Sequence, residues 1–145
     1  MAMFVRYIEE AKLTIFYAKY EADRSGALEI GPEHILLALL RDPALIEATM
    51  KGISEKEMRE ALDAHLPRRE PNTLPHDLPL GDKARQALGL AEREADILGH
   101  AKIGNRHLLL GLIESGDSYA AELLVSNGLS ADQLRRQLES LPGIT

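Results

Sequence analysis

One sequence unit occurs twice in this chain of 145 residues. Residues 21–40 align without gaps on residues 94–113, and ten of the twenty aligned positions carry the same residue. The similarity resumes at residues 52–54 and 128–130 if the second copy has three additional residues near 115–118. Because a repeat of about 65–75 residues buries little core alone, we expect the two copies to pack together as one domain about a pseudo-twofold axis.

A proline-rich segment separates the two copies. Residues 67–79 hold four of the seven prolines in the chain. Because proline lacks an amide donor and pushes the preceding residue toward extended geometry, this segment cannot be helical. We therefore predict one domain over 1–145, with repeat 1 over about residues 3–66, a linker over 67–79 and repeat 2 over about residues 80–142.

Hydrophobic spacing predicts the longest helices. In the first copy, apolar residues recur at steps of three and four from Phe4 to Ala22, which is the period of an amphipathic helix. Gly26 is suited to end that helix, and Pro32 is suited to begin the next one. This second helix is apolar on nearly every side, so we expect it to be buried at the centre.

Two shorter helices complete the first copy. Pro43 opens the third, and Ser54 with Glu57 forms a capping box for a fourth helix near 55–65. In the second copy the same pattern predicts helices near 82–98, 105–114, 117–126 and 131–140. Strand-type alternation is absent, so the predicted fold class is all-α, with two tandem four-helix repeats.

Composition excludes several classes of function. The chain has no cysteine, which rules out disulfides, thiol catalysis and cysteine-ligated zinc, and fits a reducing cytoplasm. Its 17 basic and 23 acidic residues give a net charge of −6 with no strongly basic segment, which argues against nucleic-acid binding. The longest apolar runs are too short to span a bilayer. We expect a cytoplasmic protein with neither a membrane nor a nucleic-acid partner.

The sequence contains no catalytic motif. A phosphate-binding loop G-x-x-x-x-G-K-[ST], the zinc motif H-E-x-x-H and the nucleophile motif G-x-S-x-G are all missing. His34 and His107 occupy equivalent positions near the starts of equivalent helices, where they could act as metal ligands or general bases of a hydrolase. The structural alternative, which we favour, is that each imidazole ties its helix start to nearby backbone. We therefore predict no enzyme, no cofactor and no metal site.

The aromatic residues are unevenly distributed. Five of the six lie in the first twenty residues, namely Phe4, Tyr7, Phe16, Tyr17 and Tyr20. Leu13, Tyr17 and Tyr20 lie off the apolar stripe of the first helix, so this helix has apolar residues on two faces. Such a helix either packs between the two repeats or presents one face to a partner protein, for which aromatic side chains are suitable anchors.

The duplicated motif resembles a known domain family. GPEHILLALL at 31–40 and GNRHLLLGLI at 104–113 are similar to the Clp amino-terminal repeat domain of Hsp100/Clp ring unfoldases, closest to the ClpC and ClpA type. Met3-Phe4 with Tyr7 is similar to the start of ClpC-type domains. The resemblance covers essentially the whole chain. It implies a non-catalytic domain that recruits protein substrates or adaptors for an ATP-driven Clp ring and its protease. The alternative is a free-standing accessory protein that docks on such a protease or ring.

The resemblance also implies candidate partner-binding residues. In ClpC-type domains an acidic residue is implicated in binding phosphoarginine, and it corresponds to Glu33, whose carboxylate could accept two guanidinium hydrogen bonds. The second copy has Arg106 instead, which reverses the charge, so we expect phosphoarginine to bind weakly. The alternative role of Glu33 is to stabilise its helix start through the helix dipole. The hydrophobic contact region of the family corresponds to Phe4, Tyr7, Leu13 and Leu80.

Overall fold

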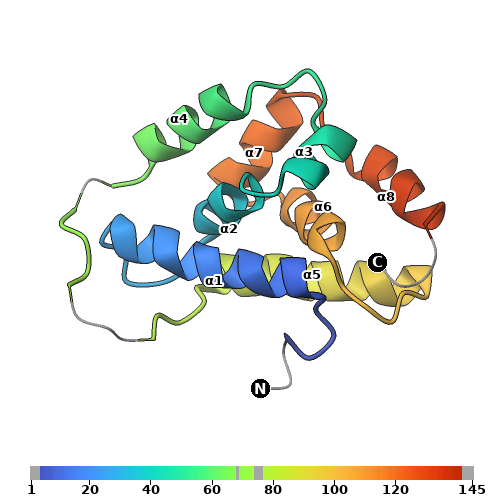
Figure 1. The fold of residues 1–145 in the computed structure, drawn as a ribbon, viewed down its shortest axis with the longest axis horizontal. Helices are drawn as coiled ribbons and strands as arrows, with labels where there is room; N and C mark the ends of the chain where they lie inside the picture. Colours follow the sequence, from blue (N-terminus) through green and yellow to red (C-terminus); the bar gives the residue numbers. More distant parts are fainter. Residues whose placement is uncertain (1–3, 68, 74–76, 142–145) are drawn as a thin grey trace.

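The computed structural model describes residues 4–67, 69–73 and 77–141, and the regular secondary structure in these ranges is helical, with extended pairing limited to two isolated bridges (Figure 1). Repeat 1 contributes α1 (Glu9–Arg24), α2 (Pro32–Leu39), α3 (Pro43–Thr49) and α4 (Glu55–His65). Repeat 2 contributes α5 (Asp82–Leu98), α6 (Asn105–Ser115), α7 (Tyr119–Ser126) and α8 (Ala131–Glu139). The predicted all-α fold of two four-helix repeats is confirmed. Met3 and positions 68 and 74–76 of the predicted linker lie outside the described residues.

The second helix of each repeat forms the centre of the molecule, as its apolar sequence predicts. Leu37 in α2 and Leu110 in α6 have no exposed surface. Figure 1 shows the long helices α1 and α5 along one side of this centre and the shorter helices on the other. Gly111 allows α6 to approach α5 closely, because a Cβ atom at this position would lie 2.3 Å from the carbonyl oxygen of Ala87. Burial of apolar surface in these layers is the main stabilising contribution to the fold.

Side-chain caps define where the shorter helices begin. The Oγ of Ser54 accepts a hydrogen bond from the backbone N–H of Glu57 at 3.1 Å, and Ser130 caps α8 in the same way at 3.0 Å. Ser118 is the cap of α7. Because a capping residue has non-helical backbone geometry, α7 begins at Tyr119, slightly later than the sequence pattern predicts.

The first helix is shorter than its hydrophobic spacing predicts. It begins at Glu9, so Phe4 lies outside the helix, in a turn that precedes it. The reason is a long-range contact, in which the backbone of Arg6 and Ile8 exchanges two hydrogen bonds with Ile103, at 2.9 and 3.0 Å. Backbone groups that are paired with a distant segment in extended geometry cannot also be bonded within a helix.

Repeat 2 makes the equivalent contact in return. Pro79 and Gly81, which precede α5, exchange two hydrogen bonds with Ile30, both at 2.9 Å. Each repeat therefore pairs the segment before its long helix with the loop before the central helix of the other repeat. Since neither repeat can satisfy these backbone groups alone, the two units form one pseudo-twofold globule.

The described residues of the linker lie against the end of α1. The backbone N–H of Asn72 donates to the carbonyl oxygen of Asp23 at 2.9 Å, and its side-chain amide donates to the Asp23 carboxylate and the Ala27 carbonyl oxygen, both at 3.0 Å. Gly26, with a φ of 74°, leaves room for this segment, because a Cβ atom there would lie 2.3 Å from the carbonyl oxygen of Glu70. These contacts fasten the linker to repeat 1.

Candidate functional site

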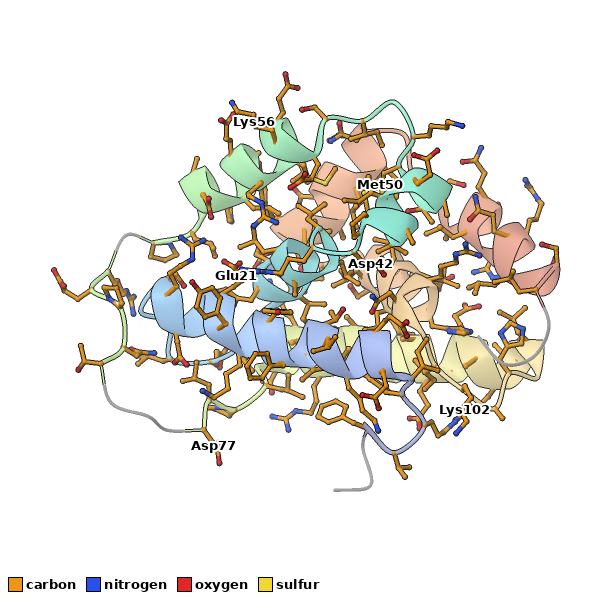
Figure 2. The ribbon with its side chains drawn as sticks, viewed as in Figure 1. Glu21, Asp42, Met50, Lys56, Asp77 and Lys102 are labelled. Carbon is orange, nitrogen blue, oxygen red and sulfur yellow. The ribbon has the colours of Figure 1, made fainter. Side chains whose placement is uncertain are left out.

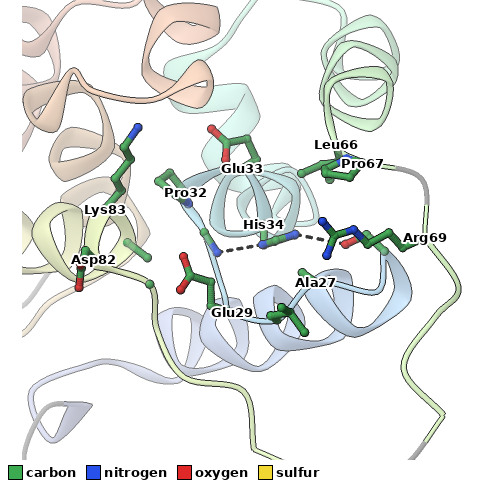
Figure 3. Close-up of a pocket in the computed structure, with 15 residues that line it drawn as sticks. Ala27, Glu29, Pro32, Glu33, His34, Leu66, Pro67, Arg69, Asp82 and Lys83 are labelled. Atoms are coloured by element: carbon green, nitrogen blue, oxygen red, sulfur yellow. Dashed lines mark hydrogen bonds between the residues drawn. The ribbon is translucent and has the colours of Figure 1, made fainter.

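Two clefts lie at equivalent positions, one beside the start of α2 and the other beside the start of α6. The first, here called cleft 1, has a volume of about 550 Å³ and is shown in Figure 3. It is bordered by the α1–α2 loop, the start of α2, the beginning of the linker and the start of α5. The second, called cleft 2, has a volume of about 630 Å³ and is bordered by the starts of α1, α3 and α6 and by Leu141. Both clefts therefore contain residues of both repeats.

The two equivalent histidines stabilise helix starts. Nδ1 of His34 accepts a hydrogen bond from the backbone N–H of Gly31 at 2.9 Å (Figure 3). Nδ1 of His107 accepts one from the backbone N–H of Gly104, also at 2.9 Å. An accepting Nδ1 places the proton on Nε2 and requires a neutral ring. Burial lowers the pKa of both histidines, and that of His107 falls to about 4 with a further contribution from His100. These contacts match the structural role that we favoured for the two rings.

Neither a metal-binding cluster nor a helix suited to cross a membrane occurs in the part of the chain that the structure describes. Within residues 4–67, 69–73 and 77–141, no group of three or more His, Asp or Glu side chains is arranged to hold a metal ion. In the same ranges, no helix combines the length and the apolar character that crossing a bilayer requires.

Glu33 lines cleft 1 and also joins the two repeats. Its Oε2 accepts a hydrogen bond from the backbone N–H of Ala120 at 3.1 Å. Ala120 lies in the first turn of α7, where backbone N–H groups have no partner within the helix. The dipoles of α2 and α7 both favour a carboxylate at this position. Glu33 thus has a structural contact with the other repeat, which its position in the sequence does not reveal.

The two clefts carry opposite charges at equivalent positions. Glu33 in cleft 1 corresponds to Arg106 in cleft 2, and Lys83 in cleft 1 corresponds to Glu10 in cleft 2. Cleft 1 also contains two further carboxylates and one arginine. Because charged groups select their ligands by complementarity, these two positions favour oppositely charged groups of a ligand in the two clefts.

The predicted apolar contact residues lie in different surroundings. Tyr7 is only 5% exposed and packs edge-to-face on Phe4, with ring centroids 5.1 Å apart, and burial raises the pKa of its hydroxyl. Phe4 and Leu80 are half-buried against the core, whereas Leu13 is 51% exposed on the outer face of α1. Tyr7 precedes a residue that lines cleft 2, and Leu80 precedes residues that line cleft 1. Of the five predicted site residues only Glu33 lines either cleft.

An exposed apolar stripe lies on the outer face of α1. We call Leu13, Phe16, Tyr17 and Tyr20 the α1 stripe. Phe16 is 64% exposed and Tyr20 is 49% exposed, while the guanidinium of Arg41 lies over the rings of Tyr17 and Tyr20, at 4.4 and 5.3 Å from their centroids. The exposed members Leu13, Phe16 and Tyr20 therefore do not pack between the repeats, while Tyr17 is half-buried against the core. The sequence pattern identifies Leu13, Tyr17 and Tyr20 as residues outside the buried face of the first helix. Phe16 lies three residues after Leu13, and this helical spacing places it on the same face.

A buried glutamate of α1 is a feature that the sequence interpretation missed. Glu21 is 1% exposed and bonds Arg24 and Arg41 at 2.8 and 3.0 Å, with Arg59 of α4 3.8 Å away. Figure 2 shows Glu21 on the side of α1 that faces α2 and α4. Burial opposes ionisation of Glu21, but the hydrogen bonds from Arg24 and Arg41 outweigh burial and hold the pKa below its usual range. The carboxylate therefore connects α1 with the residues that follow α2 and with α4.

Glu94 occupies the equivalent position in α5. Its Oε1 lies 3.1 Å from Nε of Arg135 in α8, and the same guanidinium also bonds Glu114 of α6. Hydrogen bonding to Arg135 lowers the pKa of Glu94, whereas burial and the neighbouring Glu94 raise the pKa of Glu114. The identity of positions 21 and 94 in the duplicated unit is the signal that could have found both glutamates.

Comparison with solved structures identifies the fold as that of Clp N-domains. The N-terminal domain of ClpD from Arabidopsis thaliana superposes with a TM-score of 0.72 at 22% identity, over 94% of this chain and 93% of that chain. A ClpV N-domain in complex with a VipB peptide superposes with a TM-score of 0.76 at 18% identity, over 95% of this chain and 88% of that one. At these identities the superpositions show the fold alone.

Sequence comparison then shows the family. The model of the Clp repeat (R) N-terminal domain matches residues 6–127 and 80–143. The chain is 34% identical over 145 residues to the negative regulator of genetic competence ClpC/MecB of Bacillus subtilis, covering 97% of this chain but 18% of that protein. The chain belongs to the Clp N-terminal repeat domain family. It spans less than two thirds of the length of this curated relative.

Proposed function

We propose that this chain recruits proteins, either substrates or adaptors, for a Clp/Hsp100 ATPase ring and its protease, and that cleft 1 binds a segment of the recruited protein. The observation that carries this proposal is the apolar wall of cleft 1 beside its charged groups. Leu28 is 76% exposed at this wall, which Pro32, Leu66 and Pro67 continue. An apolar wall with a few polar groups is typical of a site that binds a ligand in one orientation.

Family membership supports the proposal. The sequence contains no phosphate-binding loop. In the proposed function, ATP is therefore hydrolysed by other modules of the ring, and this chain performs no catalytic step. A ClpV N-domain forms a complex with a peptide, and cleft 1 offers a place where the same fold could bind an extended segment. The proposed recruitment takes place in the cytoplasm.

The charges in cleft 1 favour a segment with a basic side chain. Three carboxylates line the cleft beside two cations, and the five residues are Glu29, Glu33, Asp82, Arg69 and Lys83. A carboxylate binds a guanidinium well when both of its oxygens are available, but Oε2 of Glu33 already accepts a hydrogen bond from α7. The phosphate of phosphoarginine would also face the other two carboxylates. We therefore expect unmodified arginine or lysine to be preferred, and phosphoarginine to bind more weakly than about 1 mM.

Fluorescence anisotropy tests the proposal with a labelled, permanently unfolded probe, reduced and carboxymethylated lactalbumin. The test variant is Leu28→Gln, because Leu28 lies in an exposed loop where the substitution leaves the core intact. The matched control is Ile97→Gln, since Ile97 is 66% exposed in α5 and lines neither cleft. Removing an anchor worth ~1 kcal/mol lowers affinity about fivefold, and we expect at least this loss for Leu28→Gln and no change for the control. Equal affinities for all three proteins, with unchanged helix content, would contradict the proposal.

A further inference from the structure

The α1 stripe is the central part of a longer face with a charge at each end. Glu9 and Arg24 lie on the same side of the helix as the stripe, because side chains turn by about 100° per residue along a helix. Glu9 is 84% exposed, begins α1 and forms a 3.6 Å ion pair with the exposed Lys12, whereas Arg24 is 49% exposed and ends the helix. Along its length the face is therefore acidic, then apolar and aromatic, then basic.

The equivalent face of α5 has the same exposure but a different chemistry. Gln86, Gly89 and Arg93 are exposed where α1 has Leu13, Phe16 and Tyr20, and Leu90 is half-buried like Tyr17. The folded structure therefore tolerates polar residues or glycine at these positions. A contiguous exposed apolar face that packing within the fold does not require is typical of an interaction surface.

The arrangement of residues along this face is symmetric about its midpoint. Glu9 and Arg24 are equally far from the point between Phe16 and Tyr17, and so are Leu13 and Tyr20. If a second α1 lies antiparallel across the face, Glu9 of each helix meets Arg24 of the other. Leu13 then meets Tyr20, and Phe16 meets Tyr17. We propose that two copies of this chain pair through antiparallel α1 helices, in an isologous contact with twofold symmetry.

The ends of the two helices contribute favourable electrostatics to this pairing. The guanidinium of Arg24 bonds Glu21 at 2.8 Å and lies 3.6 Å from Asp63, and its five donors leave capacity for one more carboxylate. Antiparallel helices also place the positive end of one dipole beside the negative end of the other. A parallel pair would instead bring Glu9 against Glu9 and Arg24 against Arg24, which is repulsive.

The area of the stripe predicts a weak and reversible dimer. The half-exposed side chains offer roughly 300 Å² of apolar surface per copy, so pairing buries roughly 600 Å², below the ~1,200 Å² of the smallest stable interfaces. Arg41 lies over Tyr17 and Tyr20, which holds these rings in place before association and reduces the entropy lost on pairing. We expect a dissociation constant of roughly 0.1–1 mM.

Cysteine cross-linking tests the pairing and its direction, because the natural sequence contains no cysteine. Leu13→Cys and Tyr20→Cys are prepared separately and oxidised alone or as an equimolar mixture. In the antiparallel pair, position 13 of one copy lies beside position 20 of the other, whereas two residues at position 13 are about 10 Å apart along the axis, too far for a disulfide. We therefore expect the mixture to form covalent dimers about tenfold faster than either variant alone, which corresponds to a preference of ~1.4 kcal/mol.

Two controls separate the proposal from random collision. Ile97→Cys has an exposed cysteine in α5 that lies outside the proposed contact, and it should cross-link only at the collision rate. In sedimentation velocity, the weight-average coefficient of the wild type should rise with concentration, and Glu9→Lys, at an exposed position, should abolish the rise. Faster cross-linking of Leu13→Cys alone than of the mixture would overturn the antiparallel pairing. A wild type that stays monomeric at all concentrations up to about 1 mM would overturn the dimer itself.

Discussion

The two repeats share internal contacts while their surfaces differ. Each has a neutral histidine that accepts the N–H of the glycine before its central helix, at 2.9 Å in both repeats. Each also has a buried glutamate in its long helix, near an arginine of its fourth helix, with Glu21 3.8 Å from Arg59 and Glu94 3.1 Å from Arg135. These residues hold helix starts and helix pairs together, so both copies of the unit need them.

The exposed and half-buried positions of the same helices differ in charge or polarity. Glu33 of cleft 1 is replaced by Arg106 in cleft 2, and the apolar residues of the α1 stripe are replaced mostly by polar residues or glycine in α5. Substitution at the exposed positions of the α1 stripe costs little stability. The comparison therefore indicates that the duplicated contacts maintain the fold, while the positions that differ are those at which the two halves could acquire separate partners.

Substitutions in the two central helices should change the unfolding free energy most, and they test how differently the two repeats are packed. Repeat 2 has Gly111 where repeat 1 has Ala38. In Gly111→Ala the new Cβ would lie 2.3 Å from the Ala87 carbonyl oxygen, so α5 and α6 must separate, and we expect a loss of about 3 kcal/mol of unfolding free energy. The reverse change, Ala38→Gly, removes helix propensity and one methyl group, at about 1–2 kcal/mol. Urea denaturation measures both, and a larger cost for Ala38→Gly would contradict the close approach of α5 and α6.

The buried glutamates should differ in their contribution to stability. Glu21→Gln leaves Arg24 and Arg41 without their shared buried partner, and we expect it to cost about 2 kcal/mol, a figure reduced because the arginines are partly exposed. Glu94→Gln should cost about 1 kcal/mol, because Arg135 retains two other carboxylate partners. Thermal and urea denaturation at neutral pH would compare the variants. Equal losses of unfolding free energy would show that the carboxylate partners that remain beside the arginines do not decide the cost of the substitution.

The histidines predict how stability depends on pH. The pKa of His107 is about 4 in the folded chain and 6.5 for an ordinary histidine, so the unfolded state takes up the proton first as the pH falls. The stabilising contribution is complete above the unfolded value and is lost as the pH falls through 6.5 toward 4. We expect the unfolding free energy to decrease by about 2 kcal/mol over this interval, and His107→Gln to remove most of this decrease. A variant with the same pH profile as the wild type would contradict the assignment.

Reversing one charge in cleft 2 should have the smallest effect. Arg106→Glu gives cleft 2 the carboxylate that cleft 1 has at Glu33, and it leaves the buried contacts of both repeats unchanged. We expect an arginine-containing probe peptide to bind about fivefold more tightly, equivalent to ~1 kcal/mol, with the gain reduced at high salt. Isothermal titration calorimetry at two salt concentrations measures this change. A gain that does not depend on salt would contradict its electrostatic origin.

The helices and their duplication could be predicted from the order of residues. The helical period, the helix-opening Pro32 and the capping serines Ser54 and Ser130 are local signals, so they appear in the order of residues and predict elements that the structure contains. The structural role of His34 could be inferred in the same way, because its partner, Gly31, lies only three residues away.

The contacts between distant segments could not be predicted from the sequence and are visible only in the folded chain. The pairing of Arg6 and Ile8 with Ile103 ends the helical pattern before Glu9 and accompanies the burial of Tyr7, which the local spacing does not show. In the same way, the hydrogen bond from α7 to Glu33 and the assembly of each cleft from residues of both repeats depend on how the repeats pack. The physical reason is that helix periodicity and capping act within a few residues, whereas hydrogen bonds and burial between repeats depend on which surfaces the folded chain brings together.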